Sequence, residues 1–223
     1  MLRHPFERRD DLSGHRNRAG PVEAFGGIRG RLPEELKTRG VRPDDVSQVV
    51  VSHLHSDHVG WNLKKEKLGW RPFFPKARYS VARLDWEHFH KTAAEPNRAY
   101  LKETTTPLLE LGIVDLLEGE KALTPEVTAI PAPGHTPGHM ALAVVSGRER
   151  GLVLADALHV PPQVEHNDWQ ELGDVDPALA VRTRRKLLEQ AEREKALVAV
   201  SHFTPDNLGH VKNTGGRMTW QPL

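Results

Sequence analysis

The chain has 223 residues, with 31 Lys and Arg against 30 Asp and Glu, 13 His and no Cys. That length is typical of one domain with a substantial core, and the balanced charge gives no electrostatic case for a nucleic-acid or anionic-membrane partner. The lack of cysteine excludes a disulfide framework, thiolate metal ligands and a cysteine nucleophile. No apolar run is long enough for a membrane helix. Residues 1–30 lack the apolar core of a signal peptide, so we expect a cytoplasmic protein.

The predicted elements alternate between strands and helices. Residues 1–30 are polar and aperiodic, which predicts an irregular or disordered segment before one folded domain at 31–223. Strands and helices are predicted, in chain order, as a helix from Leu32 to a stop at Gly40, strands at 46–51 and 77–82, helices at 83–90 and 97–111, strands at 113–117, 127–131, 140–145 and 151–155, a helix from Asp176–Pro177 to about 194, and a strand at 197–200. The basic run of the last helix, 182–186, predicts a solvated face rather than a binding patch. The class is α/β.

Histidine is unusually frequent, and it is the commonest metal ligand in proteins. Three histidines and an aspartate are concentrated in His53-x-His55-x-Asp57-His58, directly after the buried strand 46–51. Alternate residues of an extended loop project to the same side. His53 and His55 can therefore converge on one ion, while Asp57 and His58 reach a second. An incidental group of surface histidines is the alternative.

Further candidate ligands stand where later strands end. They are His135, after strand 127–131, Asp156, at the end of strand 151–155, and His202, after strand 197–200. Loops at the carboxyl ends of strands are where α/β scaffolds present their sites. His139 reads as a structural hydrogen-bonding residue, and His88, His90, His166 and His210 as surface or outer residues.

The motifs are, in chain order, HxHxDH, then Gly134-His135-Thr136-Pro137-Gly138-His139, then a strand-terminal Asp and a strand-terminal His. The order of these motifs resembles the metallo-β-lactamase superfamily over about residues 45–210. The resemblance implies an αββα sandwich and two divalent metal ions, most commonly zinc, with iron, manganese or cobalt as alternatives. It implies that one ion is held by His53, His55 and His135, the other by Asp57, His58 and His202, and that Asp156 bridges both. It also implies a metal-bridging hydroxide as the nucleophile, formed because bound metal lowers the pKa of water.

Within the superfamily, the sequence around Asp57-His58-Val59-Gly60-Trp61-Asn62 and Asp156-Ala157-Leu158-His159 most resembles the methyl parathion hydrolase and lactonase-like subgroup. Lactonases of the family usually place a Tyr three residues after the bridging Asp, where this chain has His159. We expect His159 to hydrogen-bond a substrate oxygen, or else only to line the pocket. Asp57 is expected to pass a proton to the leaving group. Six aromatic side chains are candidates for lining an apolar cleft, or for the core, with Trp61 foremost: Trp61, Phe73, Phe74, Trp86, Phe89 and Trp169.

The resemblance implies a dinuclear metal-dependent hydrolase acting on a small apolar ester, lactone or organophosphate triester. Two alternatives remain: a metal-binding but catalytically weak member that lacks N-terminal strands, and a nuclease-type member. Family members ordinarily begin with a β-hairpin and a further strand, whereas residues 1–30 show no convincing strand. An exposed sheet edge there would favour a homodimer. We expect a small-molecule substrate and neither a nucleic acid nor a membrane as a partner.

Overall fold

The computed structural model describes residues 30–67, 69–92, 98–203, 205 and 207–223. These residues form two compact units, an N-terminal unit that ends at Leu117 and a C-terminal unit that begins at Glu118. The irregular segment expected at 1–30 lies outside the described residues except for its last position, and the expected domain limits stay a prediction. None of the described helices combines the length and the apolar character needed to cross a bilayer.

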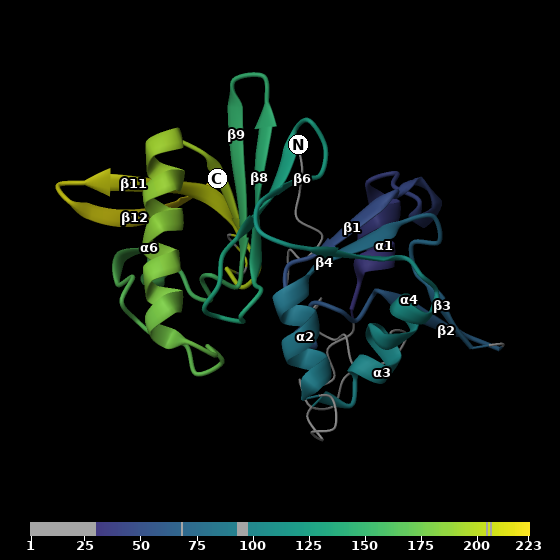
Figure 1. Cartoon of the computed structure of the whole chain (residues 1–223). Helices are drawn as coiled ribbons and strands as arrows, with labels where there is room; N and C mark the ends of the chain where they lie inside the picture. Colours follow the sequence, from purple (N-terminus) through teal and green to yellow (C-terminus); the bar gives the residue numbers. More distant parts are fainter. Residues whose placement is uncertain (1–29, 68, 93–97, 204, 206) are drawn as a thin grey trace. The chain divides into compact units, whose positions relative to one another are not determined.

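The N-terminal unit is built on a parallel sheet of three strands in the order β1-β4-β5, with a separate β2–β3 hairpin. Its elements are α1 (Leu32–Thr38), the 3-10 helix η3 (Pro43–Asp45), β1 (Gln48–Val51), β2 (Leu63–Glu66), β3 (Gly69–Pro72), β4 (Arg78–Ala82), α2 (Arg83–Lys91), α3 (Leu101–Thr104), α4 (Thr106–Glu110) and β5 (Val114–Leu117). Helices α2 to α4 form the crossover between β4 and β5 (Figure 1), as parallel strands require.

The segment at 97–111, expected to be one amphipathic helix, is two short helices over its described part. Thr105, between α3 and α4, has φ −130° and ψ −42°, which are not helical values. Pro107 accounts for the break, because proline has no N–H to continue the hydrogen bonds of α3 and is accommodated instead in the first turn of α4. The other helices and strands predicted for this unit are confirmed, with small shifts at their ends.

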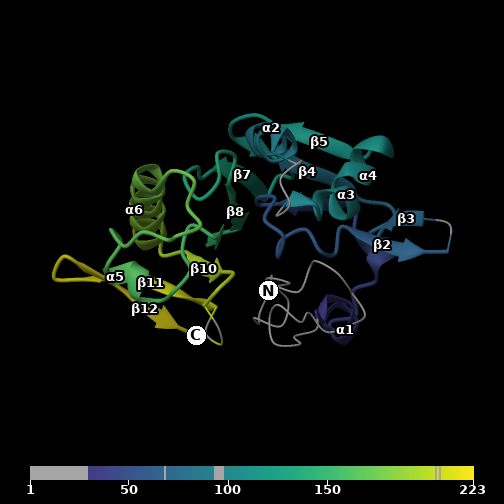
Figure 2. The ribbon, with the colours of Figure 1, turned by 90° about the horizontal axis from the view of Figure 1, so that it is seen from below.

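The C-terminal unit is a seven-stranded sheet in the order β12-β11-β10-β9-β8-β7-β6. Its elements are β6 (Lys121–Ala122), β7 (Val127–Pro131), β8 (Met140–Ser146), β9 (Glu149–Ala155), α5 (Pro162–Glu165), α6 (Pro177–Glu194), β10 (Leu197–Val200), β11 (Leu208–Thr214) and β12 (Arg217–Pro222). All neighbours pair antiparallel except β9 and β10, which are parallel. Figure 2 shows the short helix α5 beside the β11–β12 hairpin. Neither the helix nor the hairpin was predicted from the sequence.

Helix α6 lies beside this sheet (Figure 1) and supplies much of the core of the unit. Asp176 caps its start by accepting a hydrogen bond from the N–H of Leu179 at 2.9 Å. Its apolar stripe packs against β9, β10 and β11, and the cluster includes Leu187, Leu188, Ala191, Leu152, Leu154, Val198, Val200 and Val211. The helix therefore fixes the strands whose carboxyl ends carry the candidate ligands.

The sequence predicted that the whole basic run of α6, residues 182–186, faces solvent. The structure shows this for only part of the run. Arg182, Arg185 and Lys186 are exposed, but Arg184 is fully buried. The prediction was wrong for Arg184 because a charge pattern along one helix does not reveal acceptors supplied by a distant segment of the chain. Its partners are main-chain carbonyls.

Candidate metal centre

In the N-terminal unit, His53, His55, Asp57 and His58 lie on the loop that follows β1. The rings of His53 and His55 are 4.7 Å apart between centroids, and those of His53 and His58 are 4.1 Å apart. A carboxylate oxygen of Asp57 lies 3.5 Å from Nε2 of His58. The structure therefore brings these four predicted ligands into one group of imidazole nitrogens and carboxylate oxygens.

The main chain of this loop is held on both sides of Leu54, the residue between His53 and His55. The N–H of Leu54 donates to the buried carboxylate of Asp85 at 3.2 Å, and its carbonyl accepts from the Tyr100 hydroxyl at 2.7 Å. Burial raises the pKa of Tyr100 to about 12, so the hydroxyl remains a donor at neutral pH. Neither supporting role was predicted from the sequence, because Asp85 and Tyr100 contact the loop from distant parts of the chain.

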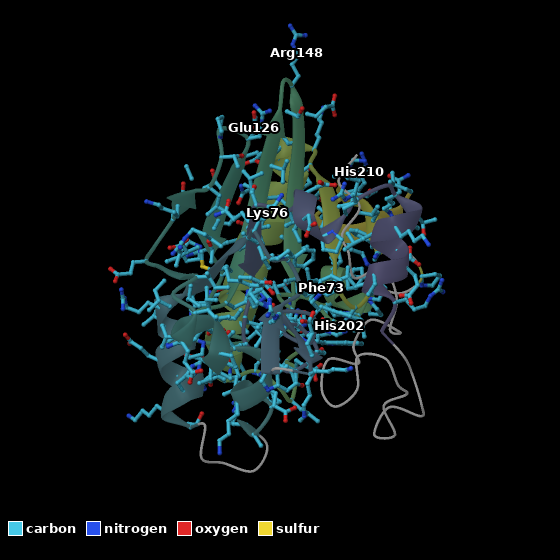
Figure 3. All side chains as sticks on the ribbon, turned by 90° about the vertical axis from the view of Figure 1, so that its right-hand side faces the viewer. Phe73, Lys76, Glu126, Arg148, His202 and His210 are labelled. Carbon is cyan, nitrogen blue, oxygen red and sulfur yellow. The ribbon has the colours of Figure 1, made fainter. Side chains whose placement is uncertain are left out.

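In the C-terminal unit, the backbone is irregular at two strand ends, just before the candidate ligands Asp156 and His202. Ala155 has φ +45°, a left-handed value that is strained for a residue with a Cβ, directly before Asp156. The pairing of β9 and β10 shifts between Ala199 and Val200, just before His202. Figure 3 shows His202 at the end of this unit opposite to Arg148, which lies at the tip of the β8–β9 hairpin. Both ligands thus stand at the same end of the sheet.

Asp156 lies at the centre of the group formed in this unit. Its Oδ2 is 3.0 Å from Nε2 of His202, 3.4 Å from Nε2 of His159 and 3.6 Å from Nε2 of His135. The donor atoms that His135, Asp156 and His159 offer lie within 4.8 Å of one another. His159, expected only to contact substrate, therefore lies among the predicted ligands.

Two contacts fix the position of His135. Gly134 has φ +133°, and a Cβ there would stand 2.3 Å from the backbone nitrogen of Ala180 in α6, so only glycine fits. On the other side, the buried carboxylate of Asp174 lies 3.0 Å from Nδ1 of His135. Burial is the largest influence on the pKa of Asp174 and raises it, but hydrogen bonds from His135 and from the Glu171 N–H outweigh burial and hold that pKa below its usual value.

The carboxylate of Asp174 thus engages Nδ1 of His135, while Nε2 faces Asp156. A carboxylate behind a ligating imidazole fixes the tautomer and raises the basicity of the ligand. Asp174 was not predicted, since nothing in its local sequence distinguishes it.

His139 is fully buried and links two backbone groups. Its Nδ1 lies 3.1 Å from the carbonyl oxygen of Ala132, and its Nε2 accepts from the N–H of Asp156 at 3.2 Å. This is the structural hydrogen-bonding role expected of it. His90 and His210 bond main-chain carbonyls, and His166 stacks on Trp169.

Most of the candidate aromatic side chains belong to the cores of the two units. Phe73, Phe74, Trp86 and Phe89 are buried. Trp61, the foremost candidate for the pocket, is partly buried and contacts the ring of Phe73. Trp169 is half exposed.

The residues present fit divalent metal ions. Each unit gathers imidazole nitrogens and at least one carboxylate oxygen, and these are the donors that zinc takes in catalytic sites lacking cysteine. In the C-terminal unit three imidazole nitrogens lie within 3.6 Å of one oxygen of the buried Asp156 carboxylate, so nitrogen and oxygen donors are already gathered there.

An α/β fold with histidines and aspartates of this order at its strand ends defines a known class. The chain matches the model of the metallo-beta-lactamase superfamily over residues 20–202, and it belongs to that superfamily. The predicted fold class is confirmed.

The chain is similar to N-acyl homoserine lactonases. It is 30% identical over 173 residues to the enzyme of Bacillus thuringiensis, covering 77% of this chain and 62% of that protein. It is 30% identical over 195 residues to AttM of Rhizobium radiobacter, covering 80% and 66%. The chain thus spans less than two thirds of these relatives. The structure of AidC, a dizinc quorum-quenching lactonase in complex with a product, superimposes with a TM-score of 0.74 at 26% identity, covering 92% of this chain and 74% of AidC.

Asp174→Asn is expected to weaken the binding of metal through His135, because the amide keeps the size of the side chain and removes its charge. Loss of such a partner typically lowers metal affinity about 10–100-fold. Competition with a chromophoric chelator measures this, and Asp168→Asn, an exposed change nearby, is the control. Equal affinities in the two variants would show that Asp174 has no influence on the ligand.

Proposed function

We propose that this chain is a divalent-metal-dependent hydrolase that opens lactones, with two metal ions, most simply zinc. The observation that carries the proposal is the group around Asp156, in which one buried carboxylate meets three imidazoles. Its similarity to proteins described as N-acyl homoserine lactonases, and to a dizinc lactonase, supports both the metal and the substrate class.

The proposed ligand assignment follows the family order. One ion would be held by His53, His55 and His135, the other by Asp57, His58 and His202, and Asp156 would be a ligand of both. When bound, the ions would supply an activated water and polarise the carbonyl oxygen of the substrate.

Two residues of the chain are assigned roles in the reaction itself. Attack of water on the lactone carbonyl carbon breaks the ring C–O bond and leaves an alkoxide that needs a proton. Asp57 takes up the proton of the attacking water and delivers it to that alkoxide. His159 donates a hydrogen bond to the carbonyl oxygen as negative charge develops on it.

A substrate panel tests the proposal. We expect the full chain loaded with zinc to convert N-hexanoyl-homoserine lactone to the ring-opened acid, detected by mass spectrometry, faster than it cleaves an aryl ester or a phosphate triester of similar size. Turnover of the triester alone would instead assign the chain to triester hydrolysis. That outcome has its own support, since an imidazole rather than a phenol follows Asp156 at the third position.

His159→Tyr is expected to raise the ratio of lactone to triester turnover, because a phenol is the donor found in lactonases of the family.

His159→Ala should lower turnover of the best substrate about 10–100-fold and keep both metals, as expected for the loss of one hydrogen bond to a developing oxyanion. Paired kinetics and metal analysis check both variants. Loss of one metal equivalent in His159→Ala would show instead that His159 is a ligand, which its place beside His135 and Asp156 allows.

A further inference from the structure

The C-terminal unit buries a cation that the ligand groups do not use. Arg184 lies in α6 and is 0% exposed, while its neighbour Arg185 is exposed. Burying a guanidinium is costly unless its donors are satisfied. A fully buried arginine on a helix that already has an apolar stripe therefore calls for a specific set of acceptors.

Arg184 donates hydrogen bonds to three main-chain carbonyl oxygens of one segment, residues 157–169. Nε donates to Ala157 at 2.8 Å, and Nη1 donates to Asn167 at 3.2 Å and to Trp169. Ala157 directly follows Asp156, and the other two residues lie at the far end of the same segment. One side chain thus ties together the two ends of 157–169.

The middle of this segment is held by a second buried side chain. Gln163, which is 2% exposed, accepts hydrogen bonds through Oε1 from the N–H of His159 at 2.7 Å and from the N–H of Val160 at 3.2 Å. Together, the hydrogen bonds of Arg184 and Gln163 restrain the main chain of the segment that carries His159. This is the arrangement in which Nε2 of His159 stands 3.4 Å from Asp156.

Arginine suits this position better than lysine does. Its planar guanidinium offers five donors in a fixed fork, whereas lysine presents its donors from a single nitrogen. Burial is the largest influence on the pKa of Arg184 and lowers it, while the carboxylates of Asp174, Glu171 and Asp168 attract the cation. Asp174 is also the partner of His135, so the cation lies in the field of the same carboxylate.

We propose that Arg184 is a positioning residue: by tying together the ends of 157–169 it holds the His159 imidazole beside Asp156. The contribution of this contact to turnover rests on the function proposed above, whereas its effect on the place of the imidazole does not.

Arg184→Lys tests the proposal, with Arg185→Lys as the matched control. Arg185 is the next residue of the helix, is exposed, and donates through Nε to the side-chain oxygen of Asn167 at 2.7 Å. In protein labelled with nitrogen-15 at histidine, we expect the ring signals of His159 to shift in Arg184→Lys and those of His210 to stay in place. We expect kcat for the lactone to fall about tenfold or more, KM to change less than about threefold, and both metals to remain. The control should change none of these.

Folded Arg184→Lys with unmoved His159 signals and wild-type kcat would overturn the proposal. If that variant does not fold, the neutral Arg184→Gln takes its place, and failure of both to fold would assign Arg184 to folding alone, which also overturns it. If the wild-type protein opens no lactone, the proposed function fails, but the ring signals still decide the role of Arg184.

Discussion

Asp156→Ala is expected to lower the metal content of the purified protein by close to two equivalents and to reduce turnover at least about a thousandfold. The reason is the position of the carboxylate, whose Oδ2 lies 3.0 to 3.6 Å from imidazole nitrogens of His202, His159 and His135. Removing one ligand shared by two ions weakens both sites at once. Metal analysis and kinetics of the variant, with Asp168→Ala as the exposed control, measure the effect.

Comparison with His55→Ala sharpens this test. His55 is assigned to one ion only, so this variant should lose about one equivalent and most of its activity. Loss of a single equivalent in Asp156→Ala as well would argue against a shared carboxylate. Wild-type rates in metal-free His55→Ala would refute the need for metal altogether.

Gly134→Ala is expected to destabilise the C-terminal unit strongly, although it adds only one methyl group. The new Cβ would stand 2.3 Å from the nitrogen of Ala180, at a φ of +133° that residues with a side chain rarely adopt. Overpacking and backbone strain each cost about 1–3 kcal/mol. We expect the midpoint of thermal unfolding of the metal-free protein to fall by about 5–15 °C.

Gly147→Ala is the matched control for this change. Gly147 has φ +59°, but a Cβ there has nothing within 4 Å. Its substitution therefore carries only the cost of the backbone conformation and should lower the midpoint less. Equal shifts in the two variants would show that the approach of Gly134 to α6 is not a tight contact.

The strands and the residues at their ends were predictable because both depend on local sequence. Runs of apolar residues mark β1 and β10, and the residues that follow them are read directly, so His53 and His202 could be predicted as candidate ligands without a structure. Pro107 could also have revealed the break between α3 and α4, since its effect on a helix is local.

The side chains that support the ligands were not predictable in the same way. Asp174 is 39 residues from His135, and Tyr100 is 46 from Leu54. Arg184 looked like one charge among several on a solvated helix face, because its acceptors belong to another segment. The left-handed conformation of Ala155 has no sequence signature, since alanine has no special preference for it.

The central claim is that metal held by these residues is required for lactone hydrolysis. The most direct measurement is the metal content of the 223-residue chain, determined by mass spectrometry before and after dialysis against a chelator, together with the rate of N-hexanoyl-homoserine lactone opening at each stage. We predict two equivalents of divalent metal per chain, loss of turnover on their removal, and recovery on addition of zinc. Undiminished turnover by the metal-free chain, or two bound equivalents without turnover, would contradict the account.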